Sequence, residues 1–123
     1  MKNKNELSDL EYQVTQQKGT EKPFTGQYYN HKEKGIYNCL VCGFDLFNSN
    51  SKYDSGSGWP SFFDQIDPKA IKINRDTSHG MIREEIVCAK CDAHLGHIFD
   101  DGPKPTGKRY CVNSCSLNFT KKD

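Results

Sequence analysis

The chain has 123 residues, of which 34% are hydrophobic and 11% aromatic, and its formal net charge at pH 7 is +1. This length suits one compact domain with its own core and is short for two. A nearly neutral charge supplies no long-range field that would gather nucleic acid or an anionic membrane surface, so we expect neither as a partner.

Charged residues are spread over the first thirty positions, which therefore contain no apolar core of a secretory signal. Nor does any run of about 18 apolar residues predict a membrane span. We expect a cytoplasmic protein that acts as a monomer. Thiols stay reduced in the cytoplasm, so the six cysteines should be metal ligands, nucleophiles or small buried residues rather than a disulfide framework.

The first predicted element is a helix that begins after Ser8. Ser8 and Glu11 have the spacing of a capping box, in which each side chain binds the backbone N–H of the other residue. Leu10 and Val14 follow at helical spacing, and Lys18-Gly19 ends the helix. We expect residues 1–24 to form this helix and an arm, and residues 25–123 to form a β-rich core.

Strand signals dominate the remainder of the chain. Runs rich in β-branched and aromatic residues, separated by turn-forming residues, predict strands at 36–41, 71–73, 81–88, 94–99 and 109–119. No segment between them predicts a long crossover helix, so the sheets should be antiparallel. The expected fold class is mainly β.

Four of the cysteines form two Cys-x-x-Cys pairs, Cys39 with Cys42 and Cys88 with Cys91. Each pair can hold one edge of a tetrahedral ion, and Gly43 would relieve the tight turn after the first pair. A thioredoxin-like redox pair would instead open a helix in a βαβ unit, whereas these pairs lie in strand-like surroundings. We predict one structural Zn²⁺ per chain, with no open coordination position for chemistry.

The remaining two cysteines lie in the sequence RYCVNSCS. On an extended strand Arg109, Cys111, Asn113 and Cys115 would share one face. A neighbouring cation stabilises the nucleophilic thiolate, and an amide can orient a polar substrate group. The alternatives are a surface role for Arg109 and simple packing for Cys115.

Two further features could serve the same site. His94 and His97 offer imidazoles for acid–base chemistry, and Trp59, framed by Gly58 and Pro60, could line an apolar pocket for a methyl or thioether group. The histidines could equally be structural, or complete a second metal site with Cys111, and a single Trp is often a core residue. A zinc-stapled binding module without turnover is a competing function, and a nucleic-acid-binding zinc ribbon is disfavoured by the charge.

These residues resemble the B-type peptide methionine sulfoxide reductases, which act on methionine-(R)-sulfoxide. The segments that carry the resemblance are 23–26, 35–37, 52–56, 58–62, 78–84, 94–103 and 109–114, in the family's order. They extend over nearly the whole chain. The resemblance implies two antiparallel sheets of the Mss4-like β-tent type, short N-terminal helices, and zinc on the four paired cysteines.

The resemblance also implies a mechanism, in which Cys111 attacks the sulfoxide of an oxidised protein or peptide methionine and becomes a sulfenic acid. Trp59 would receive the substrate's methyl group, and Phe99 and Phe119 would add apolar wall. The residues implied around the reacting sulfoxide are His94, His97, Arg109 and Asn113.

Ser57 departs from the two-cysteine version of the family, which has a resolving cysteine at this place. Cys115 is the other unassigned thiol, but four residues of extended strand span about 13 Å, whereas the Cα atoms of a disulfide lie within about 7 Å. We therefore expect an external thiol, such as thioredoxin, glutaredoxin or glutathione, to reduce Cys111. Resolution by Cys115 is the alternative, and it requires a sharp bend in the segment.

Overall fold

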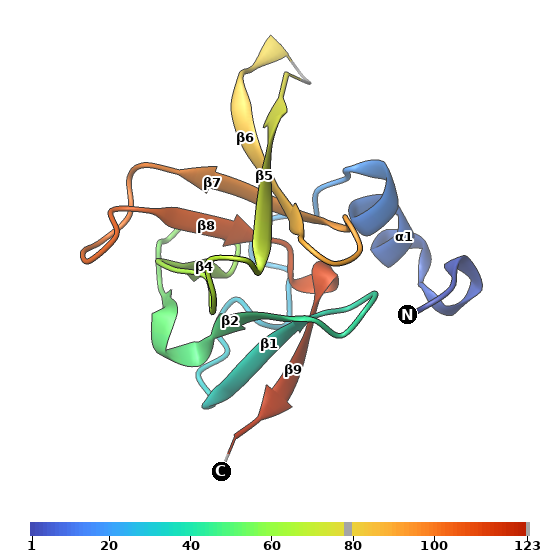
Figure 1. Cartoon of the computed structure of the whole chain (residues 1–123), viewed down its shortest axis with the longest axis horizontal. Coiled ribbons are helices and arrows are strands. Elements are labelled where there is room, and N and C mark those ends of the chain that lie inside the picture. The colour runs from blue at the N-terminus through green and yellow to red at the C-terminus, as the bar shows by residue number, and fades with distance from the viewer. Residues whose placement is uncertain (78–79, 123) are drawn as a thin grey trace.

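The computed structural model describes residues 1–77 and 80–122, and in them the chain forms two antiparallel β-sheets with one α-helix beside them (Figure 1). The mainly β prediction is confirmed. Ser78 and His79, which begin one of the family-like segments, lie outside the described residues.

The helix α1, Asp9–Gln17, follows a short 3₁₀ turn, η1, at Lys4–Glu6. The predicted capping box is present: Glu11 N donates to Ser8 Oγ at 3.1 Å, and Ser8 N donates to Glu11 Oε1 at 2.9 Å. Lys18 ends the helix in a left-handed conformation, as the Lys-Gly pair predicted. Within the described part of the chain, no helix has the length and apolarity to cross a membrane.

The larger sheet has six strands in the order β3-β4-β8-β7-β6-β5. In that order the strands are Lys52–Tyr53, Ser61–Phe62, Arg109–Val112, His94–Phe99, Arg83–Cys88 and Ile71–Asp76. A 3₁₀ turn, η2, at Ser49–Ser51 leads into β3. Figure 1 shows the β5–β6 hairpin projecting beyond the rest of this sheet.

The smaller sheet has the order β2-β1-β9, with strands at Asp45–Asn48, Gly35–Cys39 and Leu117–Lys121. The core fills the space between the two sheets and contains the fully buried Tyr37, Phe47, Phe62, Leu95 and Leu117. The rings of Phe47 and Phe62 stack with centroids 4.3 Å apart, which joins β2 of one sheet to β4 of the other.

The prediction of one strand over 109–119 is wrong. The chain leaves the larger sheet after Val112, makes a 3₁₀ turn, η4, at Ser114–Ser116, and enters the smaller sheet as β9. The Ser116 N–H bonds back to the Asn113 carbonyl at 3.0 Å, and Asn-Ser-Cys-Ser is a run of residues whose side chains favour such turns. Arg109 and Cys111 therefore keep their shared strand, whereas Cys115 leaves it.

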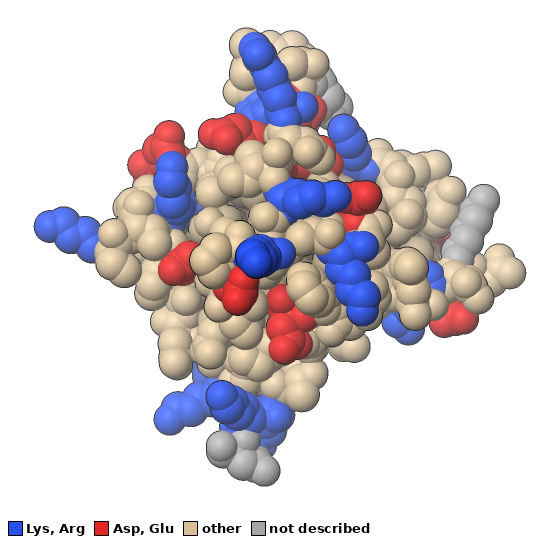
Figure 2. Space-filling view, in the orientation of Figure 1, with Lys and Arg blue, Asp and Glu red and all other residues tan. Residues whose placement is uncertain are grey.

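The surface carries charge of both signs. Figure 2 shows Lys and Arg side chains spread over the viewed face, with Asp and Glu side chains between several of them. This dispersion agrees with the formal net charge of +1.

Candidate active site and metal centre

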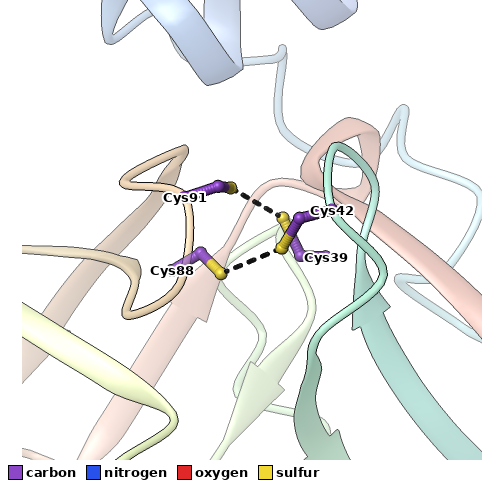
Figure 3. A group of neighbouring side chains, drawn as sticks. All are labelled: Cys39, Cys42, Cys88 and Cys91. Carbon is purple, nitrogen blue, oxygen red and sulfur yellow. Dashed lines mark hydrogen bonds between the residues drawn. The ribbon is translucent and has the colours of Figure 1, made fainter. Parts of the chain in front are cut away.

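The paired cysteines come together at the ends of β1 and β6 (Figure 3). Cys39 Sγ lies 3.6 Å from Cys91 Sγ, and Cys42 Sγ lies 3.6 Å from Cys88 Sγ. All four sulfur atoms are within 4.8 Å of one another. Sulfur atoms bound at about 2.3 Å to a tetrahedral zinc are roughly 3.8 Å apart, so this cluster fits the ion.

The two cysteine loops have the same local geometry. Gly43 N donates to Cys39 O at 2.8 Å, and Asp92 N donates to Cys88 O at 2.9 Å. Gly43 and Asp92 both have positive φ, of 80° and 64°. Gly adopts this left-handed conformation freely and Asp tolerates it, so each loop can turn its cysteines toward one point. Because four thiols form the cluster, a bound metal would join the two sheets with no position left for substrate.

A cavity of about 260 Å³ is lined largely by residues of β7 and β8. It brings together six of the predicted site residues, Trp59, His97, Phe99, Arg109, Cys111 and Asn113. Thr20, Ser57, Arg83, Gly96 and Val112 complete its lining. The predicted His94, Phe119 and Cys115 are not among the lining residues.

Cys111 lies in the middle of β8, directly opposite His97 of β7 and Ser61 of β4. Burial raises the pKa of its thiol, whereas the positive charge of Arg109 and a contact with Ser57 lower this pKa. Ser57 Oγ is 4.0 Å from Cys111 Sγ. The thiolate therefore depends on these two neighbours for its stabilisation.

Gly96 lets β7 approach the backbone of Cys111 closely. A Cβ atom at Gly96 would lie 1.9 Å from the Cys111 carbonyl oxygen. Only glycine fits this position without moving the strands apart.

Arg109 is held in a fixed orientation beside the thiol. Its Nε and Nη2 donate to the two carboxylate oxygens of Asp101 at 2.9 and 3.2 Å. Its guanidinium carbon lies 4.3 Å from the centroid of the Phe99 ring. A two-bond contact with carboxylate and stacking on an aromatic face are both typical of arginine and fix its charge near Cys111.

An irregularity in β7 places His94 and His97 on one face. Residues three apart on a regular strand point to opposite faces, but the register shifts here: Ile86 is opposite Gly96 and Val87 is opposite His94. Leu95 is the extra residue of this β-bulge. The two imidazole rings are consequently neighbours, with centroids 5.5 Å apart.

His97 lines the cavity and has a carboxylate behind it. Its Nε2 lies 2.8 Å from Asp76 Oδ2, and Arg83 Nη2 lies 3.5 Å from the same oxygen. An ionised carboxylate only accepts, so Nε2–H donates to it, and Nδ1 is the nitrogen left to exchange a proton with the cavity.

His94 lies deeper, with 2% of its surface exposed. Its Nδ1 lies 2.7 Å from Glu85 Oε2, and Glu85 Oε1 lies 3.4 Å from Lys18 Nζ. Burial lowers the pKa of His94, although Glu85 opposes this shift. The ring therefore lies beside that of His97 and does not line the cavity.

The side-chain amide of Asn113 is occupied by the protein itself. Its Oδ1 accepts from Glu21 N at 2.9 Å, and its Nδ2 donates to Leu95 O at 3.0 Å. Glu21 O in turn accepts from Trp59 Nε1 at 2.9 Å. Asn113 thus holds the arm and is linked through Glu21 to Trp59, while it also lines the cavity.

Phe119 and Cys115 lie elsewhere. Phe119, in β9, packs against His31 and Tyr37, with ring centroids 4.3 and 4.9 Å away. Cys115 lines a separate cavity of about 220 Å³ together with Glu21. Burial and the nearby Glu21 carboxylate raise the pKa of Cys115 to about 12, which disfavours its thiolate.

Sequence reasoning missed three buried acidic residues, Glu21, Asp76 and Glu85. They contact Asn113, His97 and His94 respectively. Isolated acidic residues form no pattern in one sequence. Glu85 did offer a signal, because an acidic residue at the centre of a predicted strand needs a buried partner.

A half-buried thiol beside a fixed cation and a carboxylate-backed imidazole indicates the class of protein, a thiol-based oxidoreductase. Comparison with known proteins identifies the family within this class. The SelR domain family matches residues 7–121. The chain belongs to this family, the B-type peptide methionine sulfoxide reductases.

Individual relatives are similar over most of the chain. A peptide methionine sulfoxide reductase MsrB of Acinetobacter baylyi is 63% identical over 114 residues, which are 93% of this chain and 82% of the relative. The MsrB of Hahella chejuensis is 60% identical over 118 residues, 96% of this chain and 85% of the relative. Mouse methionine-R-sulfoxide reductase B3, mitochondrial, is 61% identical over 117 residues, 95% of this chain but 46% of that longer protein.

Proposed function

We propose that this chain reduces methionine-(R)-sulfoxide in proteins and peptides to methionine, with Cys111 as the nucleophile. The observation that carries the proposal is the cavity that Cys111 lines together with Trp59, Phe99 and His97. The names of the relatives, which specify methionine sulfoxide and in one case its R form, agree with it.

Substrate binding would use the apolar and polar parts of the cavity separately. The rings of Trp59 and Phe99 would form an apolar wall of the cavity. The methyl and thioether groups of the substrate would pack against it, since sulfur and methyl groups make favourable contacts with aromatic rings. The sulfoxide oxygen would point toward His97. Arg109 favours the Cys111 thiolate through its charge.

In the chemical step, the Cys111 thiolate attacks the sulfoxide sulfur while His97, held at Nε2 by Asp76, gives a proton to the sulfoxide oxygen. The oxygen is transferred to Cys111, which becomes a sulfenic acid, Cys–SOH. The substrate leaves as the thioether, methionine. Cys111 is oxidised and the substrate sulfur is reduced by the same two electrons.

An external dithiol or two thiols would then restore Cys111, yielding a disulfide and water. A thioredoxin-type donor, glutaredoxin or glutathione supplies suitable chemistry. Ser57 has no thiol to form an internal disulfide. Cys115 lines a different cavity, and its raised pKa also disfavours it as the attacking group.

We further propose that Cys39, Cys42, Cys88 and Cys91 hold a structural zinc ion. When bound, the ion would supply a cross-link between the sheets rather than Lewis-acid chemistry. The whole chain, 1–123, would then work as one reductase domain. Residues 1–24 form its helix and arm, and residues 25–123 form a β core that the metal would cross-link.

The proposal is tested by following methionine formation from the separate R and S sulfoxides of a peptide, with dithiothreitol as reductant. Wild type should reduce the R form, Cys111→Ser should be inactive, and the matched variant Cys115→Ser should retain activity. Equal rates for wild type and Cys111→Ser would contradict the proposal. Preference for the S form would contradict the substrate assignment.

A further inference from the structure

Glu21 lies in the arm after α1 and is almost fully buried, with 3% of its surface exposed. Its backbone and its carboxylate are each bound to a different part of the site. This one residue therefore connects two segments that are distant from it in sequence, one at Trp59 and one that runs from Asn113 to Cys115.

The backbone of Glu21 links Asn113 to Trp59. Glu21 N donates to Asn113 Oδ1 at 2.9 Å, and Glu21 O accepts from Trp59 Nε1 at 2.9 Å. The indole ring has only this one N–H donor, so its hydrogen bond with Glu21 sets the ring's orientation along the cavity wall.

The carboxylate of Glu21 fixes that backbone in place. Its Oε1 accepts from Cys115 N at 3.0 Å, and Cys115 belongs to η4, the turn that follows the catalytic strand. Asn113 is the N-cap of η4 but makes no side-chain cap bond, because its amide is bound to Glu21 N and Leu95 O. Glu21 therefore supplies the cap from the opposite end of the chain.

The fit around the carboxylate is tight. A Cβ atom at Gly26 would lie 2.4 Å from Glu21 Oε2 and 2.2 Å from Ser114 Oγ. Burying a carboxylate costs free energy unless hydrogen bonds compensate, and Oε2 has no hydrogen-bond partner among the described residues, so the bond from Cys115 N to Oε1 is the one that ties the carboxylate to η4. A shorter side chain could not span from the arm to η4 without moving the arm.

We propose that Glu21 is a positioning residue for Trp59: it caps the turn after Cys111 and presents its own carbonyl to the indole N–H, which holds the ring at the wall of the cavity. This inference rests on the proposed function for the meaning of the cavity. The geometry of Trp59 can nevertheless be tested without activity.

Trp59 is the single tryptophan of the chain, so its fluorescence reports this contact directly. Glu21→Ala removes the cap and frees the arm. We expect a red-shifted emission, faster exchange of the indole N–H in NMR spectra, and a KM for the sulfoxide peptide raised about tenfold with kcat changed much less. Glu21→Gln keeps an acceptor of the same length, so its emission, indole exchange and KM should stay close to those of wild type.

Glu11→Ala is the matched control. Glu11 also binds a backbone N–H with its carboxylate, that of Ser8, but it has no contact with Trp59. It should lower thermal stability while leaving the emission and KM unchanged. If Glu21→Ala leaves emission and KM unchanged, or if both Ala variants change them equally, the inference is overturned.

Should Glu21→Ala not fold, Glu21→Asp and Glu21→Gln decide the question. Asp keeps the charge but is one methylene too short, so it should raise KM and red-shift emission more than Gln does. Equal values for the two would overturn the inference. If wild type reduces no methionine sulfoxide, the proposed function fails, while the emission and indole exchange of these variants still test the position of Trp59.

Discussion

The Cys111 thiol is subject to opposing electrostatic effects. Burial raises its pKa, and the Arg109 charge together with the Ser57 hydroxyl lowers it. The thiolate is the reacting form, so alkylation of Cys111 should become faster as pH rises through this pKa. The net effect is a raised pKa, because burial, together with the Glu21 carboxylate, outweighs the charge of Arg109 that Asp101 holds in place.

Replacement of Arg109 by Ala removes the stabilising charge and should raise the pKa of Cys111. The rising part of the pH–rate profile should then move to higher pH, with about a tenfold lower rate at neutral pH for each unit of the shift. The measurement is the pH dependence of iodoacetamide alkylation in a Cys115→Ser background. Lys108→Ala, which removes the neighbouring cation paired with Asp100, should leave the profile in place; an unshifted profile for Arg109→Ala would contradict the assigned role.

Ser57 lies close enough to Cys111 to test how the oxidised enzyme is restored. Its Oγ is 4.0 Å from Cys111 Sγ, so a small side-chain rotation would bring two sulfur atoms to bonding distance. We expect Ser57→Cys to form a disulfide with Cys111 after one turnover with methionine sulfoxide, visible by peptide mapping.

The matched variant for this experiment is Ser55→Cys. Ser55 Oγ bonds to the hydroxyls of Ser57 and Ser61 but makes no recorded contact with Cys111. It should form no such disulfide. Free thiols at both 57 and 111 after turnover of Ser57→Cys would show that the loop cannot bring these atoms together.

At the scale of elements, the contact of β7 with β8 depends on Gly96. A Cβ there would collide with the Cys111 carbonyl, so Gly96→Ala should lower the free energy of unfolding by about 1–3 kcal/mol and also slow alkylation of Cys111. Urea unfolding and the alkylation rate measure the two effects.

Gly35→Ala is the control that distinguishes a general loss of stability from a local effect on Cys111. A Cβ at Gly35 would lie 2.3 Å from the Thr120 carbonyl oxygen, in the smaller sheet. This variant should lose comparable stability and keep the wild-type alkylation rate at Cys111. If both variants slow alkylation equally, the effect of Gly96 on the site is not local.

Elements whose signals are local could be predicted from the sequence. The capping box and helical spacing of α1, and β7 at 94–99, need only neighbouring residues, and both predictions are confirmed. The strands β2, β3 and β4 were missed because they are too short to show the alternation of polar and apolar residues that identifies a strand. The break after Val112 was missed although Asn-Ser-Cys-Ser is a local turn signal, and the bond that holds the turn comes from Glu21, 94 residues before Cys115.

The same distinction applies to the candidate site across the whole molecule. Spacing identified the two cysteine pairs, which form one cluster in the structure. The family-like motifs pointed to Cys111, Trp59 and His97, which line one cavity. The tertiary partners of these residues, Glu21 and Asp76 among them, depend on how sheets and arm pack. The bulge at Leu95, which turns His94 and His97 to one face, likewise leaves no trace in the spacing.

The four-cysteine cluster is the point where the two sheets are joined, since β1 ends in one cysteine loop and β6 in the other. The cavity is lined by other residues, so the proposed metal site and the proposed chemistry are separated. Loss of metal should therefore act on stability first and on the reactivity of Cys111 only through unfolding.

Cys39→Ser tests this separation. Removing one thiolate opens the metal site, and because metal binding free energy is folding free energy, Tm should fall by more than about 10 °C and the zinc content should drop. The alkylation rate of Cys111 in the folded fraction should stay near the wild-type value. Elemental analysis and calorimetry make the comparison with Cys115→Ser, which lacks a half-buried thiol outside the cluster and should retain both zinc and Tm. Retained zinc with an unchanged Tm in Cys39→Ser would contradict a structural zinc at this position, whereas loss of zinc with an unchanged Tm would mean that packing between the sheets holds the fold without the ion.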